Sequence, residues 1–594
     1  MSDNNEELEK LHGDHKIPLK ELLKRSIKYT KGVRHLLVFA FILLIISVGI
    51  DVCLPLLIKE FVNHLKQEDT TKIVLWTALW LVIGYTGLGI STQLFRYFEA
   101  ILLQKAGQQI VYQLRMEVFV HIENMSLNQF NDMAVGALVT RVANYTSSMS
   151  ELFTDVLMTL LSDILMASSV FCVMLVISWK LSLFLLIFVA LAFVVTLFFG
   201  RIIGGAFRKE RKYVSDLNTF LSENLAGMRI IQIFNKQKDK IKEFDEKNEN
   251  LASAQFKVVL VFTFYRPLLN LLYYGAVAST FGMGIVFALN AGEIASFYLF
   301  LSNFFNPIQD IADKLNQVTR ATTACERLFN LLDVQPEVLD SEDAIEIDHF
   351  EGKIEFKNVW FAYEKDNWIL KDVSFVVEPK QTVAFVGATG AGKTTILSLI
   401  VRNFEIQKGQ ILIDGIDIKK IKIESLRRAV GQMLQDVFLF SGTIKSNITL
   451  HDEEFTDQQV WEACDYVNAS SFINRQENKL EQEVVERGEN FSSGQRQLLS
   501  FARTILHKPQ ILILDEATAN IDTETEMLIQ ESLLKIKTLG TMLVVAHRLS
   551  TIQHADNIIV LQNGEIIETG NHQTLLKNKG YYYKLYQLQF ENGR

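Results

Sequence analysis

The sequence predicts an all-α domain of six membrane-spanning helices, followed by an α/β domain of the P-loop class. Long apolar stretches occupy the chain before about residue 310. After about residue 340, short apolar runs alternate with charged turns, as in soluble α/β proteins. A GxxxxGKT segment lies in this second half, between an expected strand and an expected helix. The overall composition of 49% hydrophobic and 21% charged residues therefore averages two different halves.

Six stretches in the first half are predicted to cross a membrane. A helical span needs about 20 mostly apolar residues to cross a hydrocarbon core of about 30 Å. The sixth stretch is short, and its helix is expected to continue beyond it. No cleavable signal peptide is expected, because no small-residue cleavage site follows the first stretch. The predicted spans are residues 36–58, 73–95, 156–177, 181–199, 258–289 and 294–305.

Basic residues predict which ends of the spans face the cytoplasm, because cytoplasmic segments carry an excess of Lys and Arg. The third and fourth spans are joined by little more than Trp179 and Lys180, which predicts a short external turn. The connections 96–155 and 201–257 have helical periodicity and few breakers, so long helices should project into the cytoplasm. The basic residues before the first span and after the fourth are Lys16, Lys20, Lys24, Arg25, Lys28, Lys31 and Arg34, and Arg201, Arg208, Lys209, Arg211 and Lys212.

Three charged residues, Asp51, Asp163 and Arg266, fall inside predicted spans, where charge is costly. Two interpretations stay open. In the first, the three residues have a structural explanation: they pair with one another, extend to the membrane interface or show that the span boundaries are wrong. In the second, they line a substrate path. Pro267 follows Arg266, and we expect a helix kink there.

Composition excludes several other classes of protein. The four cysteines, Cys53, Cys172, Cys325 and Cys464, lack CxxC or His-paired spacing, so neither a zinc site nor a disulfide framework is predicted. The net charge of −9 provides no general basic surface, so no nucleic-acid partner is expected.

The second half opens with predicted strands at 354–356, 373–377 and 382–386, and the third leads into a phosphate-binding loop. Glycines allow backbone N–H groups to close around phosphates, Lys393 balances the β/γ charge, and Thr394 offers a hydroxyl to Mg²⁺. Thr395 begins the following apolar helix and is also predicted to bind the nucleotide. ATP and Mg²⁺ are the expected cofactors. The loop reads Gly387, Ala388, Thr389, Gly390, Ala391, Gly392, Lys393 and Thr394.

Residues 511–515 form a continuous apolar run that ends in a carboxylate, which is typical of a buried central parallel strand. The carboxyl end of such a strand reaches the phosphate site. Asp515 is expected to hold Mg²⁺ through water. Glu516 follows at the strand tip and is predicted to be the general base that polarises the attacking water.

Between these two motifs, Phe491-Ser492-Ser493-Gly494-Gln495 resembles the LSGGQ signature of ATP-binding cassette (ABC) transporters. Essentially the whole chain resembles the exporters of this family, in which six spans precede one nucleotide-binding domain. The resemblance implies that Ser492, Ser493, Gly494 and Gln495 complete the ATP site of a partner subunit.

Four further matches come from the same resemblance. Tyr363 resembles the aromatic residue that stacks on adenine, and Gln435 the glutamine that contacts Mg²⁺ and senses the membrane domain. Asp522 resembles the D-loop aspartate, which crosses between two nucleotide-binding domains. His547 is similar to the switch histidine that holds the γ-phosphate. Taken alone, Tyr363 could instead be an ordinary aromatic residue of an edge strand, and His547 could be a histidine of the hydrophobic core.

Two segments of the first half resemble the coupling regions of such exporters. Residues 125–133 lie where the family places its first coupling helix, and residues 223–229 followed by Phe234 resemble its second cytoplasmic loop. A solvated amphipathic loop is the alternative. The implied layout is an N-terminal segment at 1–35, a transmembrane domain at 36–320, a linker at 321–350 and a nucleotide-binding domain at 351–594.

The resemblance implies ATP-driven export of hydrophobic or amphipathic small molecules, drugs or lipids, by alternating access in a dimer. In the signature, Phe491 replaces Leu and Ser493 replaces Gly, a departure that favours a heterodimer, with a homodimer as the alternative. An ATP-gated channel or a regulatory subunit also stays open, although Glu516 favours a hydrolysing pump. The spans argue against a soluble ABC ATPase, the fused domains against an importer, and the short segment before the first span against a peptide exporter with a processing protease.

Overall fold

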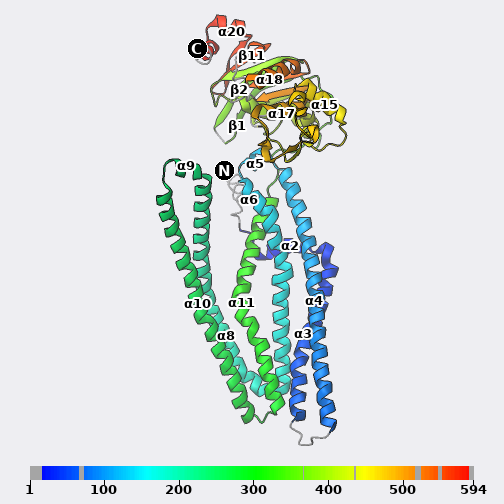
Figure 1. The fold of residues 1–594 in the computed structure, drawn as a ribbon, viewed down its shortest axis with the longest axis vertical. Helices are drawn as coiled ribbons and strands as arrows, with labels where there is room; N and C mark the ends of the chain where they lie inside the picture. The colour runs from blue at the N-terminus through cyan, green and yellow to red at the C-terminus, as the bar shows by residue number, and fades with distance from the viewer. Residues whose placement is uncertain are drawn as a thin grey trace. The chain divides into compact units, whose positions relative to one another are not determined.

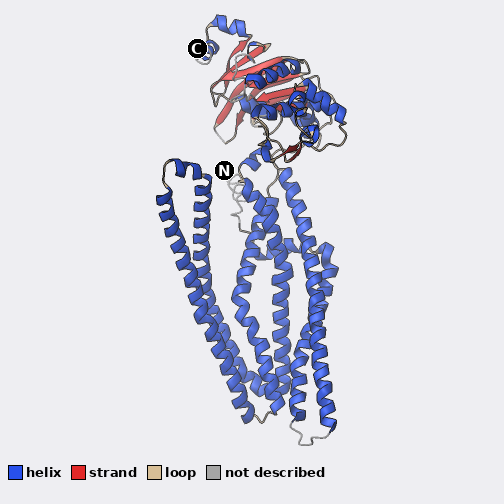
Figure 2. Cartoon of the chain, viewed as in Figure 1, coloured by secondary structure: helices blue, strands red, loops and turns tan. Residues whose placement is uncertain are grey.

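The computed structural model describes residues 16–65, 72–364, 367–433, 437–515, 523–545 and 552–587. The chain divides into two compact units, one of Met1–Glu123 with Met133–Val334 and one of Asn124–Asp132 with Gln335–Arg594. Figure 2 shows that the described part of the first unit is helical, whereas the second combines helices with strands. The predicted order of a helical membrane domain and an α/β domain is confirmed.

The long helices of the first unit contain the predicted apolar stretches, apart from a few residues at the ends of two stretches (Figure 1). The first, second, fifth and sixth stretches belong to α3, α4, α10 and α11, and the third and fourth both belong to α8. The α-helices of the unit are α2 (Leu19–Tyr29), α3 (Arg34–Leu65), α4 (Lys72–Glu123), α6 (Val135–Thr140), α7 (Thr146–Glu151), α8 (Met158–Ala226), α9 (Met228–Ile233), α10 (Gln237–Val286) and α11 (Ala291–Leu332).

Among the described residues, three helical segments are long and apolar enough to cross a membrane: Lys31–Asn63, Val135–Ala226 and Gln237–Val286. The second of these contains two predicted spans. Between them, α8 is broken at Ser178, which has non-helical backbone angles (φ −155°, ψ 100°). This break lies next to the turn predicted at Trp179 and Lys180. The stretches in α4 and α11 lie outside the three segments, so the total of six spans stays a prediction.

The charged residues inside the predicted spans each have a partner that the sequence did not identify. Asp51 accepts a hydrogen bond of 2.5 Å from Arg96, and Asp163 accepts one from Lys314. The guanidinium of Arg266 lies 5.5 Å from the centre of a phenylalanine ring in the same helix. Of the interpretations left open, the pairing of Asp51, Asp163 and Arg266 with one another is not what the structure shows. α10 continues through Pro267.

A six-stranded sheet forms the centre of the second unit, in the order β12-β11-β3-β10-β9-β6. All neighbours are parallel except β11 and β12. Its central strands are mainly apolar and buried, as expected for strands covered on both faces. The strands are β3 (Thr382–Gly387), β6 (Val430–Met433), β9 (Ile511–Asp515), β10 (Thr541–Val545), β11 (Asn557–Gln562) and β12 (Glu565–Gly570).

The second unit also contains a four-stranded antiparallel sheet, in the order β2-β1-β4-β5, and a two-stranded ribbon formed by β7 and β8. These strands are β1 (Ile354–Ala362), β2 (Trp368–Val377), β4 (Lys408–Ile413), β5 (Ile416–Asp417), β7 (Gly442–Thr443) and β8 (Glu483–Val484). The α-helices of the unit are α5 (Leu127–Asn131), α12 (Lys393–Ile400), α13 (Ile423–Ala429), α14 (Ile444–Thr449), α15 (Asp457–Tyr466), α16 (Ser470–Ile473), α17 (Ser493–Leu506), α18 (Thr523–Ile536), α20 (His572–Asn578) and α21 (Tyr581–Tyr586).

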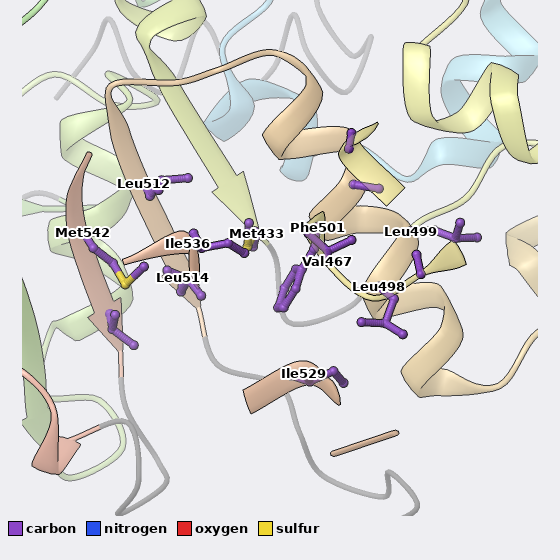
Figure 3. Packing of buried hydrophobic residues seen from close by; sticks show 14 of the residues in the cluster. Met433, Val467, Leu498, Leu499, Phe501, Leu512, Leu514, Ile529, Ile536 and Met542 are labelled. Atoms are coloured by element: carbon purple, nitrogen blue, oxygen red, sulfur yellow. The ribbon is translucent and has the colours of Figure 1, made fainter. Parts of the chain in front are cut away.

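Alternate residues of β9 enter two different hydrophobic cores, because successive side chains of a strand point to opposite faces. Ile511 and Ile513 pack in the core that contains α12. Leu512 and Leu514 pack in the core that contains α17 and α18, where they lie near Phe501 (Figure 3). Burial on both faces fixes the position of the end of β9.

The register brings the ends of three strands to one edge of the sheet. Val545 of β10 pairs with Phe385 of β3 on one side and with Asp515 of β9 on the other. On the next strand, Met433 of β6 pairs with Leu514. Because these strands are parallel, the segments that follow them all leave from the same edge.

Helix α5 lies inside the segment that was expected to form the first coupling helix, and it packs within the second unit. Its N-cap Ser126 and Gln129 form a capping box. The Gln129 amide also donates a hydrogen bond of 2.7 Å to the carbonyl of Gln335, and the Ser126 hydroxyl donates one of 3.2 Å to Glu337.

Candidate nucleotide site

The predicted phosphate loop connects β3 to α12 in a conformation that depends on glycine. Gly390 and Gly392 have φ angles of +81° and +99°, which residues other than glycine rarely adopt. At Gly387, an added Cβ would lie 2.3 Å from the carbonyl oxygen of Leu561. The loop leads directly into α12, whose first backbone N–H groups have no partner inside the helix and suit an anion.

Lys393 is the first residue of α12 and is only 6% exposed. Its ammonium donates hydrogen bonds of 2.9 Å and 3.0 Å to the carbonyls of Gly387 and Ala388. Burial lowers the pKa of Lys393, and the negative charge of Asp515 opposes part of that effect. The lysine is thus held inside the loop by the backbone of the loop itself.

The carboxylate predicted to hold Mg²⁺ lies close to this lysine. Asp515 ends β9, and its charge acts on Lys393. Thr394 follows the lysine, and its side chain is exposed at the start of α12. The structure therefore brings together the predicted phosphate lysine and one predicted metal carboxylate.

Tyr363 lies beside the first turn of α12, a contact that the sequence did not reveal. Its hydroxyl is 3.1 Å from the hydroxyl of Thr395, and either oxygen can donate. The ring meets Phe361 and Phe404 edge to face, with centroids 4.9 Å and 5.1 Å away, and the residue stays 45% exposed. One side of the aromatic is held while another remains open, as a base-stacking residue requires.

The signature segment forms the N-terminus of α17. Ser492 is the N-cap, and its hydroxyl accepts a hydrogen bond of 3.2 Å from the backbone N–H of Gln495. The Gln495 side chain in turn accepts one of 3.0 Å from the Ser492 N–H. Ser493 is exposed, and Gly494 is buried. Gln495, predicted as a nucleotide contact, thus caps the helix, and the S-x-x-Q pattern could have shown this.

Phe491, which replaces the family's leucine, is 5% exposed and packs 6.3 Å from Phe472, ring centre to ring centre. This substitution is accommodated in the hydrophobic core. Four other predicted site residues, Gln435, Glu516, Asp522 and His547, lie outside the described residues.

Gly387→Ala is expected to destabilise the second unit by about 1–3 kcal/mol, because backbone must move to admit the methyl group. Thermal unfolding of the purified protein measures this effect. Gly390→Ala is the matched control, since its added Cβ has nothing within 4 Å and meets only the strain of a positive φ. Equal unfolding temperatures for wild type and Gly387→Ala would contradict the close approach to Leu561.

The fold and the site define a membrane transporter that binds ATP. The family model for the ABC transporter transmembrane region matches residues 37–308, and the ABC transporter model matches residues 370–519. The chain belongs to the ABC transporter family. It is an exporter-type membrane protein that couples ATP hydrolysis to transport, and exporters of this type work as dimers on membrane substrates.

Relatives match almost the full length of the chain. The ABC transporter protein exp8 of Streptococcus pneumoniae is 37% identical over 96% of this chain and 97% of its own length. An ATP-dependent lipid A-core flippase of Syntrophus aciditrophicus is 32% identical, covering 97% and 95%. The multidrug resistance-like ATP-binding protein MdlB of Buchnera aphidicola is also 32% identical, covering 98% and 100%.

A solved structure shares the fold. The structure of a bacterial Atm1-family ABC exporter with ATP bound superposes with a TM-score of 0.81 and 26% sequence identity. The match covers 94% of this chain and 98% of the other. The helical unit and the α/β unit are therefore both those of an ABC exporter.

Proposed function

We propose that this chain exports hydrophobic or amphipathic small molecules, drugs or lipids, across the cell membrane by alternating access. The observation that carries the proposal is the presence, in one chain, of a phosphate loop with a buried lysine and a helical unit with apolar spans. The names of two relatives, a lipid A-core flippase and a multidrug resistance-like protein, support this class of substrate. The N-terminus and the ATPase domain are proposed to be cytoplasmic, because basic residues flank the first and fourth spans.

The residues at the loop fit a magnesium nucleotide. A helix N-terminus and the Lys393 ammonium suit phosphate oxygens, and the hydroxyl of Thr394 and the carboxylate of Asp515 are oxygen donors of the kind that Mg²⁺ prefers. Bound Mg²⁺ would reduce the negative charge between β- and γ-phosphates. Lys393 is proposed to bind the phosphates, Glu516 to accept a proton from the attacking water, and His547 to hold the γ-phosphate.

The surface around α9 supports a dimer. Leu225, Ile230, Ile233 and Phe234 are exposed on α9 or next to it. Such an apolar cluster indicates a surface that another molecule covers. By contrast, α5 already packs against Gln335 and Glu337 of its own chain. We infer that α9 contacts the nucleotide-binding domain of a second subunit and transmits its closure to the spans.

The exposed Ser493 supports a heterodimer in which this chain supplies the intact catalytic residues and its partner supplies the unaltered signature. Purified alone, the chain should hydrolyse ATP slowly, because each site of a homodimer would meet a serine side chain where the family has glycine. Ser493→Gly is then expected to raise the turnover several-fold. Phosphate release measures this, and full drug-stimulated activity of the unaltered chain alone would contradict the heterodimer.

Transport itself is tested in sealed inside-out vesicles that contain the full transporter. A pump is expected to accumulate a fluorescent amphipathic drug or lipid only with hydrolysable ATP. An ATP-gated channel would instead equilibrate the same molecule without accumulating it, which would refute the proposed export.

A further inference from the structure

A cavity of about 810 Å³ lies between α8 and α10, which run side by side in the first unit (Figure 1). Small residues, Gly205, Ala206 and Ala254, leave the space between the two helices open. The walls are apolar and include exposed side chains such as Phe264. Two charged residues also line the cavity, and both are lysines, Lys209 and Lys257.

Both lysines lie at the same end of this cavity. α8 and α10 are antiparallel, because Phe199 meets Tyr265 and Phe207 meets Phe262, with ring centroids 5.6 Å and 6.2 Å apart. This register places Lys209 level with Lys257. By the same register, Phe199 of α8 and Leu268 of α10, both lining residues, lie at the opposite, apolar end.

The length of the cavity matches one leaflet of a bilayer. From Lys257 to Leu268, at the start of the predicted fifth span, α10 rises about 16.5 Å at about 1.5 Å per residue. This is about half of a hydrocarbon core of about 30 Å. The apolar wall therefore has the reach of an acyl chain that starts at the level of the headgroups.

The lysines are available to an anion. Both side chains are exposed, and neither forms an ion pair with a carboxylate among the described residues. A purely apolar groove would accept any lipid, whereas two cations at its end select a negative headgroup, because basic pockets between spans favour anionic lipids.

We propose that this cavity binds one anionic phospholipid, with its headgroup phosphate between Lys209 and Lys257 and an acyl chain along the apolar wall. The site is separate from the nucleotide site, and it does not depend on what the protein exports. Lipid occupancy would hold α8 and α10 together at the level where the spans end.

The test compares phosphatidylglycerol with phosphatidylcholine, each titrated into the delipidated full-length protein in detergent and counted by native mass spectrometry. The wild type is expected to bind phosphatidylglycerol more tightly. The double variant Lys209→Ala/Lys257→Ala should lose about 30-fold in phosphatidylglycerol affinity, about fivefold for each lysine, with little change for phosphatidylcholine. Lys212→Ala, on the same helix but outside the cavity lining, is the matched control and should bind like the wild type.

A second pair of variants tests the apolar part. Gly205→Leu is expected to weaken both lipids, since an added Cβ there meets only the end of the flexible Arg208 side chain, at 3.9 Å, and the larger side chain would fill the cavity. Gly200→Leu is the control, because it has open space and does not line the cavity.

Two outcomes would overturn the proposal. One is that the double variant shows no loss of phosphatidylglycerol affinity beyond that of Lys212→Ala, which would indicate at most an effect of general surface charge. The other is that the double variant changes dimer formation but binds phosphatidylglycerol like the wild type, which would assign the groove to a second copy of the chain. Neither outcome bears on export, because lipid binding is read without transport.

Discussion

Glu516→Gln is expected to bind ATP as tightly as the wild type and to hydrolyse it about 10²–10⁴-fold more slowly. The amide has the size of the carboxyl group but accepts no proton from the attacking water. Binding should persist because the phosphates are proposed to be held by the loop and by Lys393, whose ammonium is already positioned by two backbone carbonyls. Phosphate release gives the turnover, and retention of labelled ATP gives the affinity.

A surface glutamate provides the control for this variant. Glu531 lies on α18 and forms an exposed ion pair of 3.0 Å with Lys535. Glu531→Gln removes the same charge from the same domain and should leave turnover unchanged. If Glu516→Gln also hydrolyses ATP at the wild-type rate, Glu516 is not the general base.

Lys393→Ala is expected to lower the affinity for ATP by about 10–100-fold, the range that loss of a charge-assisted hydrogen bond to phosphate implies. The effect should be large because Lys393 is almost fully buried in the loop, where few water molecules screen its charge. An equilibrium titration with Mg²⁺ and a fluorescent ATP analogue measures it.

Lys422→Ala serves as the comparison, because Lys422 forms only an exposed ion pair of 2.8 Å with Glu346. It removes an ammonium from the same unit and should bind the nucleotide normally. Thermal unfolding of both variants without nucleotide separates a binding defect from a folding defect. Wild-type affinity in Lys393→Ala would show that the backbone of the loop alone holds the phosphates.

The sequence predicted the parts of the site that depend on local pattern. The glycine spacing from Gly387 to Gly392 and the apolar run that ends at Asp515 each require only neighbouring residues to be recognised. The capping box between Ser492 and Gln495 is equally local, and a scan for caps would have found it. Burial on both faces of the sheet follows from the same apolar runs.

Contacts between distant residues could not be predicted in this way. Tyr363 and Thr395 are 32 positions apart, and Asp163 and Lys314 are 151 apart. Which partner each finds depends on the packing of whole helices and strands, and hydrophobic periodicity does not specify that packing. This is why the sequence marks Asp51 and Asp163 as unusual but does not identify their partners, Arg96 and Lys314.

The division of β9 between two cores has a consequence for communication within the chain. Asp515 is proposed to belong to one ATP site, and Ser493 at the start of α17 is proposed to contribute to another. Leu514 lies next to the first residue and packs in the same core as Phe501 of α17. Densely packed interiors transmit displacements instead of absorbing them. A displacement at the end of β9 would therefore reach α17 through this shared core, which connects the predicted Mg²⁺ carboxylate to the signature segment.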